Sequence, residues 1–221
     1  MRWSNPIRRN QHGLVFLWLA NDRPEVIGTL FCYERGPVVR TKHSFHSLAR
    51  EKLTGRFGDQ LAWQPPTAGV KFAPVPGAPL PASTPVERTR QMKALAAEFS
   101  AVLRDAKGTD EELRMLPQAL HRYNQSKAPL MDGAIYAFVL GTDPEALLIL
   151  ETDFTANEPR WEYAFARFHF DEVIAKHRDQ VVFRVDADGE QKTTNVGDPA
   201  SRDKVYVSFH AREEPLAKPA D

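Results

Sequence analysis

Two long segments of the sequence match each other without a gap at a constant offset of 120 positions. Gly13 falls on Gly133, and the dipeptide Pro24-Glu25 falls on Pro144-Glu145. Aromatic residues also fall on aromatic residues, at Trp3/Tyr123, Phe16/Tyr136, Trp18/Phe138, Phe45/Phe165 and Trp63/Phe183. A register that is kept through several turns predicts an internal duplication. Two copies are too few for a solenoid, which needs about three repeats, so we expect two similar β-meanders related by a pseudo-twofold axis.

Each copy alternates strand-length apolar runs with turn residues, which is typical of antiparallel hairpins. Asn21–Pro24 and Gly141–Pro144 have turn chemistry and fall in register with each other. The strands expected in the first copy are 14–20, 26–33, 38–48 and 61–64. Those expected in the second copy are 134–140, 146–151, 161–170, 173–176 and 181–185, and 205–210 follows as a last strand.

A change of composition separates the two copies. Seven prolines lie between residues 65 and 85, which excludes a helix or a central strand there and predicts an extended connector. Thr84-Pro85-Val86-Glu87 then forms a capping box with proline at the first helical position. The apolar residues Met92, Leu95, Phe99 and Val102 follow at helical spacing, so the sequence predicts a helix over 85–106.

These features together predict an α+β fold, mainly antiparallel sheet, with two similar β-meanders and one main helix. We expect one compact domain in which the segments follow in the order first β-meander 1–64, Pro-rich connector 65–85, helix and lead-in 86–120, second β-meander 121–190, and C-terminal strand and tail 191–221. The second copy has an apolar lead-in at 113–120, whereas only Met1 precedes Arg2. We therefore also expect the chain to be part of a longer protein.

Composition and motifs exclude several classes of protein. The 29 lysines and arginines balance the 29 aspartates and glutamates, so the basic surplus of a nucleic-acid-binding protein is missing. No apolar run reaches the roughly 18–20 residues of a membrane span, and no signal region opens the sequence. A single cysteine, Cys32, excludes an internal disulfide. Without a G-x-G-x-x-G, Walker or G-x-S-x-G motif, we expect no cofactor and no serine-hydrolase elbow.

Several stretches of the sequence resemble an uncharacterised bacterial protein family of the planctomycete type. The resemblance covers most of residues 2–184 and rests on Arg2-Trp3-Ser4-Asn5-Pro6, 69–76, 113–117 and 132–145. It implies no catalytic residue, because the family has no assigned activity. It also implies that the full-length protein has a longer N-terminus, in some members with an export signal.

The strand expected at 40–48 contains the candidate ligand-binding residues. Alternation places Arg40, Lys42, Ser44 and His46 on one face. At the positions equivalent to Ser44 and His46, the second copy has Ala164 and Ala166. Two cations, a hydroxyl and an imidazole on one face suit a polar or anionic small ligand. The alternative interpretation is an ordinary solvent-facing strand surface.

Other candidate residues favour structural roles. His43 and His46 point to opposite faces of a strand, so we expect no metal site. Asp143 and Glu145 are interpreted as exposed hairpin-turn residues rather than paired catalytic carboxylates. The aromatic residues Trp161, Tyr163 and Phe165 favour a core face beneath the helix over a ligand-binding face.

The function expected from the sequence is a non-catalytic binding or interaction domain of a larger bacterial protein, with a protein or a polar or anionic small molecule as its partner. The alternative is a hydrolase-type enzyme that uses His46 with Ser44 or Arg40. A pocket separates the two hypotheses, because an enzyme needs a concave site with convergent polar groups. The sequence does not indicate an oligomeric state.

Overall fold

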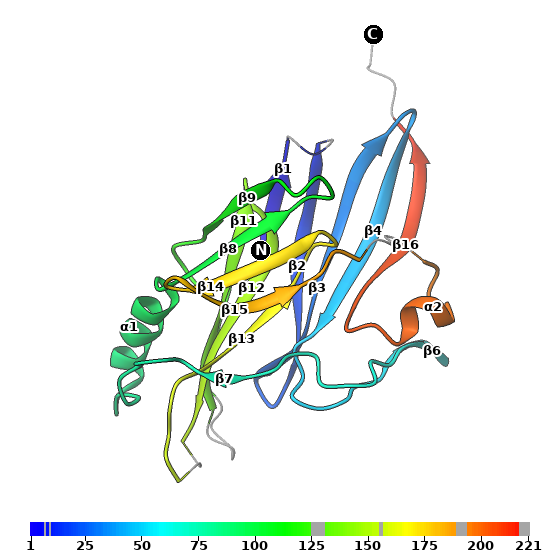
Figure 1. Ribbon diagram of the computed structural model, residues 1–221. Helices are drawn as coiled ribbons and strands as arrows, with labels where there is room; N and C mark the ends of the chain where they lie inside the picture. Colours follow the sequence, from blue (N-terminus) through cyan, green and yellow to red (C-terminus); the bar gives the residue numbers. More distant parts are fainter. Residues whose placement is uncertain (7, 9, 125–130, 155–156, 189–193, 217–221) are drawn as a thin grey trace.

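The protein is built from antiparallel strands arranged in two large sheets and one small one (Figure 1). The computed structural model describes residues 1–6, 8, 10–124, 131–154, 157–188 and 194–216. The expected α+β class is wrong, because the chain is 56% strand and 8% helix, and one sheet curls into a half-barrel. Residues 99–104 of the segment expected to be helical form a strand instead.

The first sheet has five strands in the order β1-β2-β3-β4-β16, and its first four are a simple meander. The small two-stranded sheet, β5-β6, follows the meander along the chain. The bounds are β1 Arg2–Asn5, β2 Gln11–Ala20, β3 Arg23–Arg35, β4 Val38–Ser47, β5 Gly55–Phe57, β6 Gln60–Trp63 and β16 Tyr206–Pro215.

The second sheet has nine strands in the order β15-β14-β8-β9-β11-β12-β13-β7, with β10 also paired to β11. In Figure 1, β8, β14 and β15 cross in front of β11, β12 and β13, so the sheet folds back over its own face. The bounds are β7 Ala73–Pro74, β8 Phe99–Arg104, β9 Asp110–Met115, β10 His121–Asn124, β11 Met131–Leu140, β12 Asp143–Asp153, β13 Glu162–Arg167, β14 Glu172–His177 and β15 Gln180–Val185.

The strand pairings of β1–β6 and β10–β15 follow the same offset of 120 positions as the sequence. The register shifts fall at equivalent points as well, after Trp18 in β2 and after Phe138 in β11. The two segments therefore share strand order and register. Equivalent pairs include Trp3–Gly13 and Tyr123–Gly133, Trp18–Val26 and Phe138–Ala146, and Val26–Ser47 and Ala146–Arg167.

The recurrence of glycine at positions 13 and 133 has a steric cause. A Cβ atom added at Gly13 would lie 2.8 Å from the ring of Trp3, and one added at Gly133 would collide with the ring of Tyr123. In both halves an aromatic side chain of the first strand therefore lies over the backbone of the second strand.

The predicted helix exists but is shorter than expected. Helix α1 spans Pro85–Ala96, and Thr84 caps it by accepting a hydrogen bond from the backbone of Glu87, as the capping box predicts. The predicted end at residue 106 is wrong, because the chain enters β8 at Phe99. The apolar residues there are buried at every second position, which is the period of a strand. No helix among the described residues is long and apolar enough to cross a membrane; α2, the other helix, spans Pro199–Arg202.

Strands β11, β12 and β13 are buried on both faces. One face packs against the first sheet in a cluster that includes Ile27, Ile135, Leu147, Ile149, Ala164 and Ala166. The other face packs beneath α1, β8 and β14 in a cluster that includes Met92, Leu95, Phe99, Phe138, Phe165 and Val173. Trp161, Tyr163 and Phe165 all belong to this second cluster, so their interpretation as core residues is confirmed.

Candidate functional site: an aromatic hollow on the first meander

The four residues predicted to bind a ligand lie in two different environments. Ser44 and His46 are 1% and 3% exposed, because their face of β4 is the one that packs toward the second sheet. Arg40 and Lys42, nearer the start of the strand, are half-buried. Arg40 forms an ion pair with Glu213 at 2.7 Å, and the ammonium of Lys42 lies 5.1 Å from the ring centre of Tyr33. The structure therefore does not bring the four side chains together, and their binding of a ligand stays a prediction.

His46 is held in a structural setting. Its Nδ1 lies 2.7 Å from the carbonyl oxygen of Ser47, and its ring packs against Tyr206 at 6.0 Å. Burial lowers the pKa of His46 to about 4, so the imidazole is neutral near pH 7. His46 also lines a cavity of about 500 Å³ between the connector, at Val70, and Arg167 of β13.

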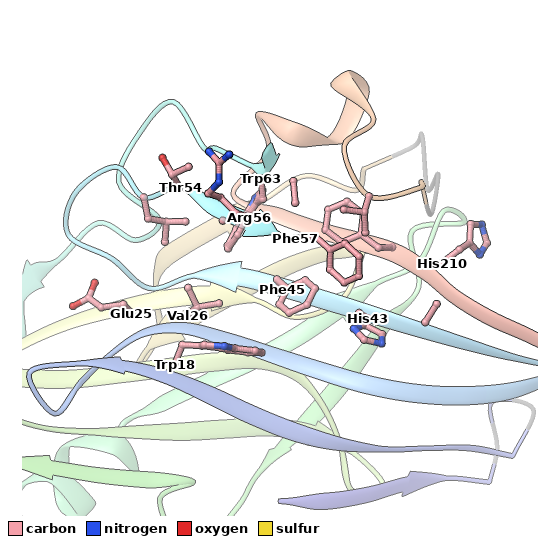
Figure 2. A pocket seen from close by; sticks show the side chains of 16 residues that line it. Trp18, Glu25, Val26, His43, Phe45, Thr54, Arg56, Phe57, Trp63 and His210 are labelled. Atoms are coloured by element: carbon pink, nitrogen blue, oxygen red, sulfur yellow. The ribbon is translucent and has the colours of Figure 1, made fainter. Parts of the chain in front are cut away.

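The opposite face of the same strand carries a larger cavity. His43 and Phe45 point into a hollow of about 880 Å³ that is lined mainly by apolar side chains. Figure 2 shows the aromatic side chains gathered there. They come from four parts of the fold, namely Trp18 from β2, Phe45 from β4, Phe57 and Trp63 from the β5–β6 hairpin, and Phe209 from β16.

Phe45 is the centre of this aromatic hollow. Its ring centre lies 5.5 Å from that of Trp18, 6.3 Å from Trp63 and 6.1 Å from Phe209. Gly28 lies against both rings, since a Cβ atom there would lie 2.9 Å from the Phe45 ring and 3.0 Å from Trp18. The absence of a side chain at Gly28 thus lets the rings of Phe45 and Trp18 pack closely on the backbone of β3.

The walls of the hollow differ in how firmly they are held. The indole of Trp63 donates a hydrogen bond to the carbonyl of Lys204 at 2.6 Å, which fixes one wall. Trp18 is 48% exposed and Phe57 is 70% exposed, so these two rings are open to solvent. Polar groups at the hollow are few, and they include Glu25, Arg56 and His43. Partial burial lowers the pKa of His43, which favours the neutral form of its ring.

The aromatic hollow of the first half corresponds, at the offset of 120 positions, to a filled core in the second half. At the offset of 120, Trp18, Phe45 and Trp63 correspond to Phe138, Phe165 and Phe183, all of which belong to or pack on the cluster beneath α1. There the space is occupied by side chains of α1, β8 and β9. Sequence reasoning missed this site because the match of aromatic residues between the two segments does not indicate which of them is covered. The difference lies in what covers them, which depends on contacts distant in the sequence.

Two polar clusters join the halves. The carboxylate of Glu151 accepts hydrogen bonds from Tyr123, at 2.5 Å, and from Arg23, at 3.2 Å. At the turn between β11 and β12, Asp143 and Glu145 face the first half. Asn5 donates to Asp143 at 3.4 Å, and Arg8 donates to Glu145 at 2.7 Å.

The expected exposure of Asp143 and Glu145 is wrong, because both are buried. Their partners Asn5 and Arg8 lie 137 or 138 positions away in the sequence, beyond the reach of turn chemistry. Burial raises the pKa of Asp143 to about 7. Burial and the charge of Asp143 also raise the pKa of Glu145.

The described residues form no group of three or more histidine, cysteine, aspartate or glutamate side chains that could hold a metal ion. The hollow itself offers aromatic and aliphatic contacts with a thin polar rim, which suits binding of an apolar surface. No family model, curated protein or solved structure matches the chain. Interpretation of the site therefore depends on its geometry.

Proposed function

We propose that the protein is a non-catalytic binding module and that the aromatic hollow of the first meander is its binding surface. One observation carries the proposal. Trp18 and Phe57 are exposed in the first half, whereas their counterparts in the second half, Phe138 and His177, are buried. Exposed apolar patches with a concave shape are characteristic of binding sites.

The energetics favour an occupant. Full burial of a large apolar side chain is worth about 1.5–3 kcal/mol relative to leaving it in water. Phe57 is 70% exposed and Trp18 is 48% exposed, so both leave much of this free energy unrealised in the isolated chain. A ligand that covers both side chains and the ring of Phe45 gains it on binding.

The hydrolase alternative has less support. A general base needs to reach the proton that it abstracts, but His46 is buried and its Nδ1 faces the carbonyl oxygen of Ser47. His43, at the hollow, is surrounded mainly by apolar side chains. We therefore propose the binding role alone.

We also propose that the two halves arose by duplication of one meander. The shared pairing registers and the shared positions of the register shifts support this origin. On this view the aromatic hollow is a core position that lacks its cover in the first half, which explains why it is rich in aromatic residues.

A titration with the apolar dye 8-anilinonaphthalene-1-sulfonate tests the binding surface. We expect the dye to fluoresce on the native protein, and we expect Phe57→Ser and Trp18→Ser to reduce the signal severalfold. Leu80→Ser is the matched control, because Leu80 is 81% exposed in the connector, away from the hollow. Circular dichroism checks that each variant is folded. Equal dye binding by folded Phe57→Ser, folded Trp18→Ser and the wild type would contradict the proposal.

A further inference from the structure

The aromatic hollow lies between two strand edges whose counterparts are bridged in the second half. There β8 pairs with β14 along its whole length, and β9 pairs with β11 at Phe138 and Val139. The equivalent edges in the first half belong to β5 and to β2 at Trp18 and Leu19. Within the described part of the chain, β5 pairs only with β6, and β1 covers β2 only as far as Val15.

Strands β8 and β9, which bridge the corresponding edges in the second half, show which side chains pack at such a site. Phe99, Ala101 and Leu103 of β8 and Leu113 of β9 are all buried in the cluster beneath α1. They alternate with more exposed residues along β8. An occupant of the same geometry in the first half is an extended hairpin whose apolar side chains recur at every second position.

The charges on the two edges differ. In the second half, Glu172 of β14 lies opposite Arg104 of β8. The residues equivalent to Glu172 and Lys176 in the first half are Lys52 and Arg56, and both are exposed. Lys52, just before β5, and Arg56, within β5, therefore place two cations along this edge, and carboxylates on a facing strand would complement them.

On the basis of the proposed function, we propose that the occupant of the hollow is a β-hairpin of a partner polypeptide with acidic residues facing Lys52 and Arg56. Its two strands add between β5 and β2, as β8 and β9 stand between β14 and β11. Backbone hydrogen bonds to the strand edges give affinity, and the alternate apolar side chains enter the aromatic hollow. The β8–β9 hairpin of the chain itself serves as a natural template for the ligand.

The experiment uses the full chain and a synthetic peptide of residues 98–116 that carries Arg104→Glu. Hydrogen exchange measured by NMR should show that the peptide slows exchange of backbone amides in Gly55–Phe57 and near Trp18 by tenfold or more at saturation. Protection of backbone amides distinguishes strand addition from mere contact with apolar rings.

Charge reversal tests the register. The Arg104→Glu peptide should bind the wild type about two- to fivefold more tightly than the unaltered peptide, as expected for one cross-strand ion pair. Lys52→Glu should reverse this preference for the Arg104→Glu peptide. Lys93→Glu, at an exposed position of α1, should leave the preference unchanged. Isothermal titration calorimetry gives the affinities.

The outcomes separate this inference from the proposed function. Dye binding at the hollow without peptide binding or amide protection would overturn the hairpin and leave the binding surface standing. Loss of both would overturn both. Protection of Gly55–Phe57 that grows with protein concentration in the absence of peptide would assign the hollow to a second copy of the chain and overturn a separate partner.

Discussion

Trp18 and Phe138 occupy the same register position in equivalent hairpins, opposite Val26 and Ala146, but Trp18 is 48% exposed and Phe138 is 1% exposed. The local backbone does not account for the difference, since both residues precede the same register shift. What differs is the covering layer, because β8, β9 and α1 lie over Phe138. Similar local sequence thus gives a core in one half and an open aromatic surface in the other.

The two aromatic residues should contribute very differently to stability. Phe138→Ala removes a fully buried ring and should lower the free energy of unfolding by about 3–5 kcal/mol. Trp18→Ala removes a ring that is half in water and should lower it by less than about 1.5 kcal/mol. Equilibrium unfolding in urea measures both. Similar losses in the two variants would show that the hollow is as closed in solution as the core beneath α1.

The hairpins within each segment could be predicted from the sequence, although the α+β class was wrong, because glycines, turn residues and aromatic residues fix register locally. The offset between Gly13 and Gly133 reappears in the strand pairings, since each glycine makes room for an aromatic ring on the neighbouring strand. The end of α1 could not be predicted, because Phe99 and Val102 fit helical spacing as well as a strand. Pairing of β8 with β14, 68 to 78 positions away, decides between the two.

The candidate site could be predicted only in part. Alternation along β4 correctly separates the face of Ser44 and His46 from the face of His43 and Phe45. It does not indicate which face meets the second sheet, and the polar face turned out to be the buried one. A buried polar side chain is tolerated when it is hydrogen-bonded, and the Ser47 carbonyl satisfies the His46 ring.

The buried imidazole of His46 should titrate at unusually low pH. Burial lowers its folded pKa to about 4 from an ordinary value of 6.5, so the unfolded state binds the proton more readily. The contribution to stability is present above about pH 6.5 and is lost as the pH falls toward 4. NMR of the ring protons should give a midpoint near 4 in the folded protein. A midpoint near 6.5 would show that the ring is hydrated and accessible.

A variant separates this effect from other titrating groups. His46→Gln removes the titration, so its unfolding free energy should fall less steeply than that of the wild type between about pH 6.5 and 4. Val86→Ala, at an exposed position on α1, is a control that should keep the slope of the wild type.

The buried pair Asp143 and Glu145 should give the opposite dependence on pH. Burial raises the folded pKa of Asp143 to about 7, above its ordinary value of 3.8, so between about pH 4 and 7 the folded state holds a proton that the unfolded state has released. This contribution to stability is complete below about pH 4 and is lost as the pH rises through 7.

Asp143→Asn mimics the protonated carboxyl, and its side-chain oxygen can still accept the hydrogen bond from Asn5. The variant should therefore match the wild type near pH 4 and become progressively more stable than the wild type up to about pH 8. Asp179→Asn, in the exposed turn between β14 and β15, should show no such divergence. Urea unfolding at a series of pH values measures the difference, and a constant offset between Asp143→Asn and the wild type would mean that Asp143 is already ionised at pH 4 through its contacts with the first half.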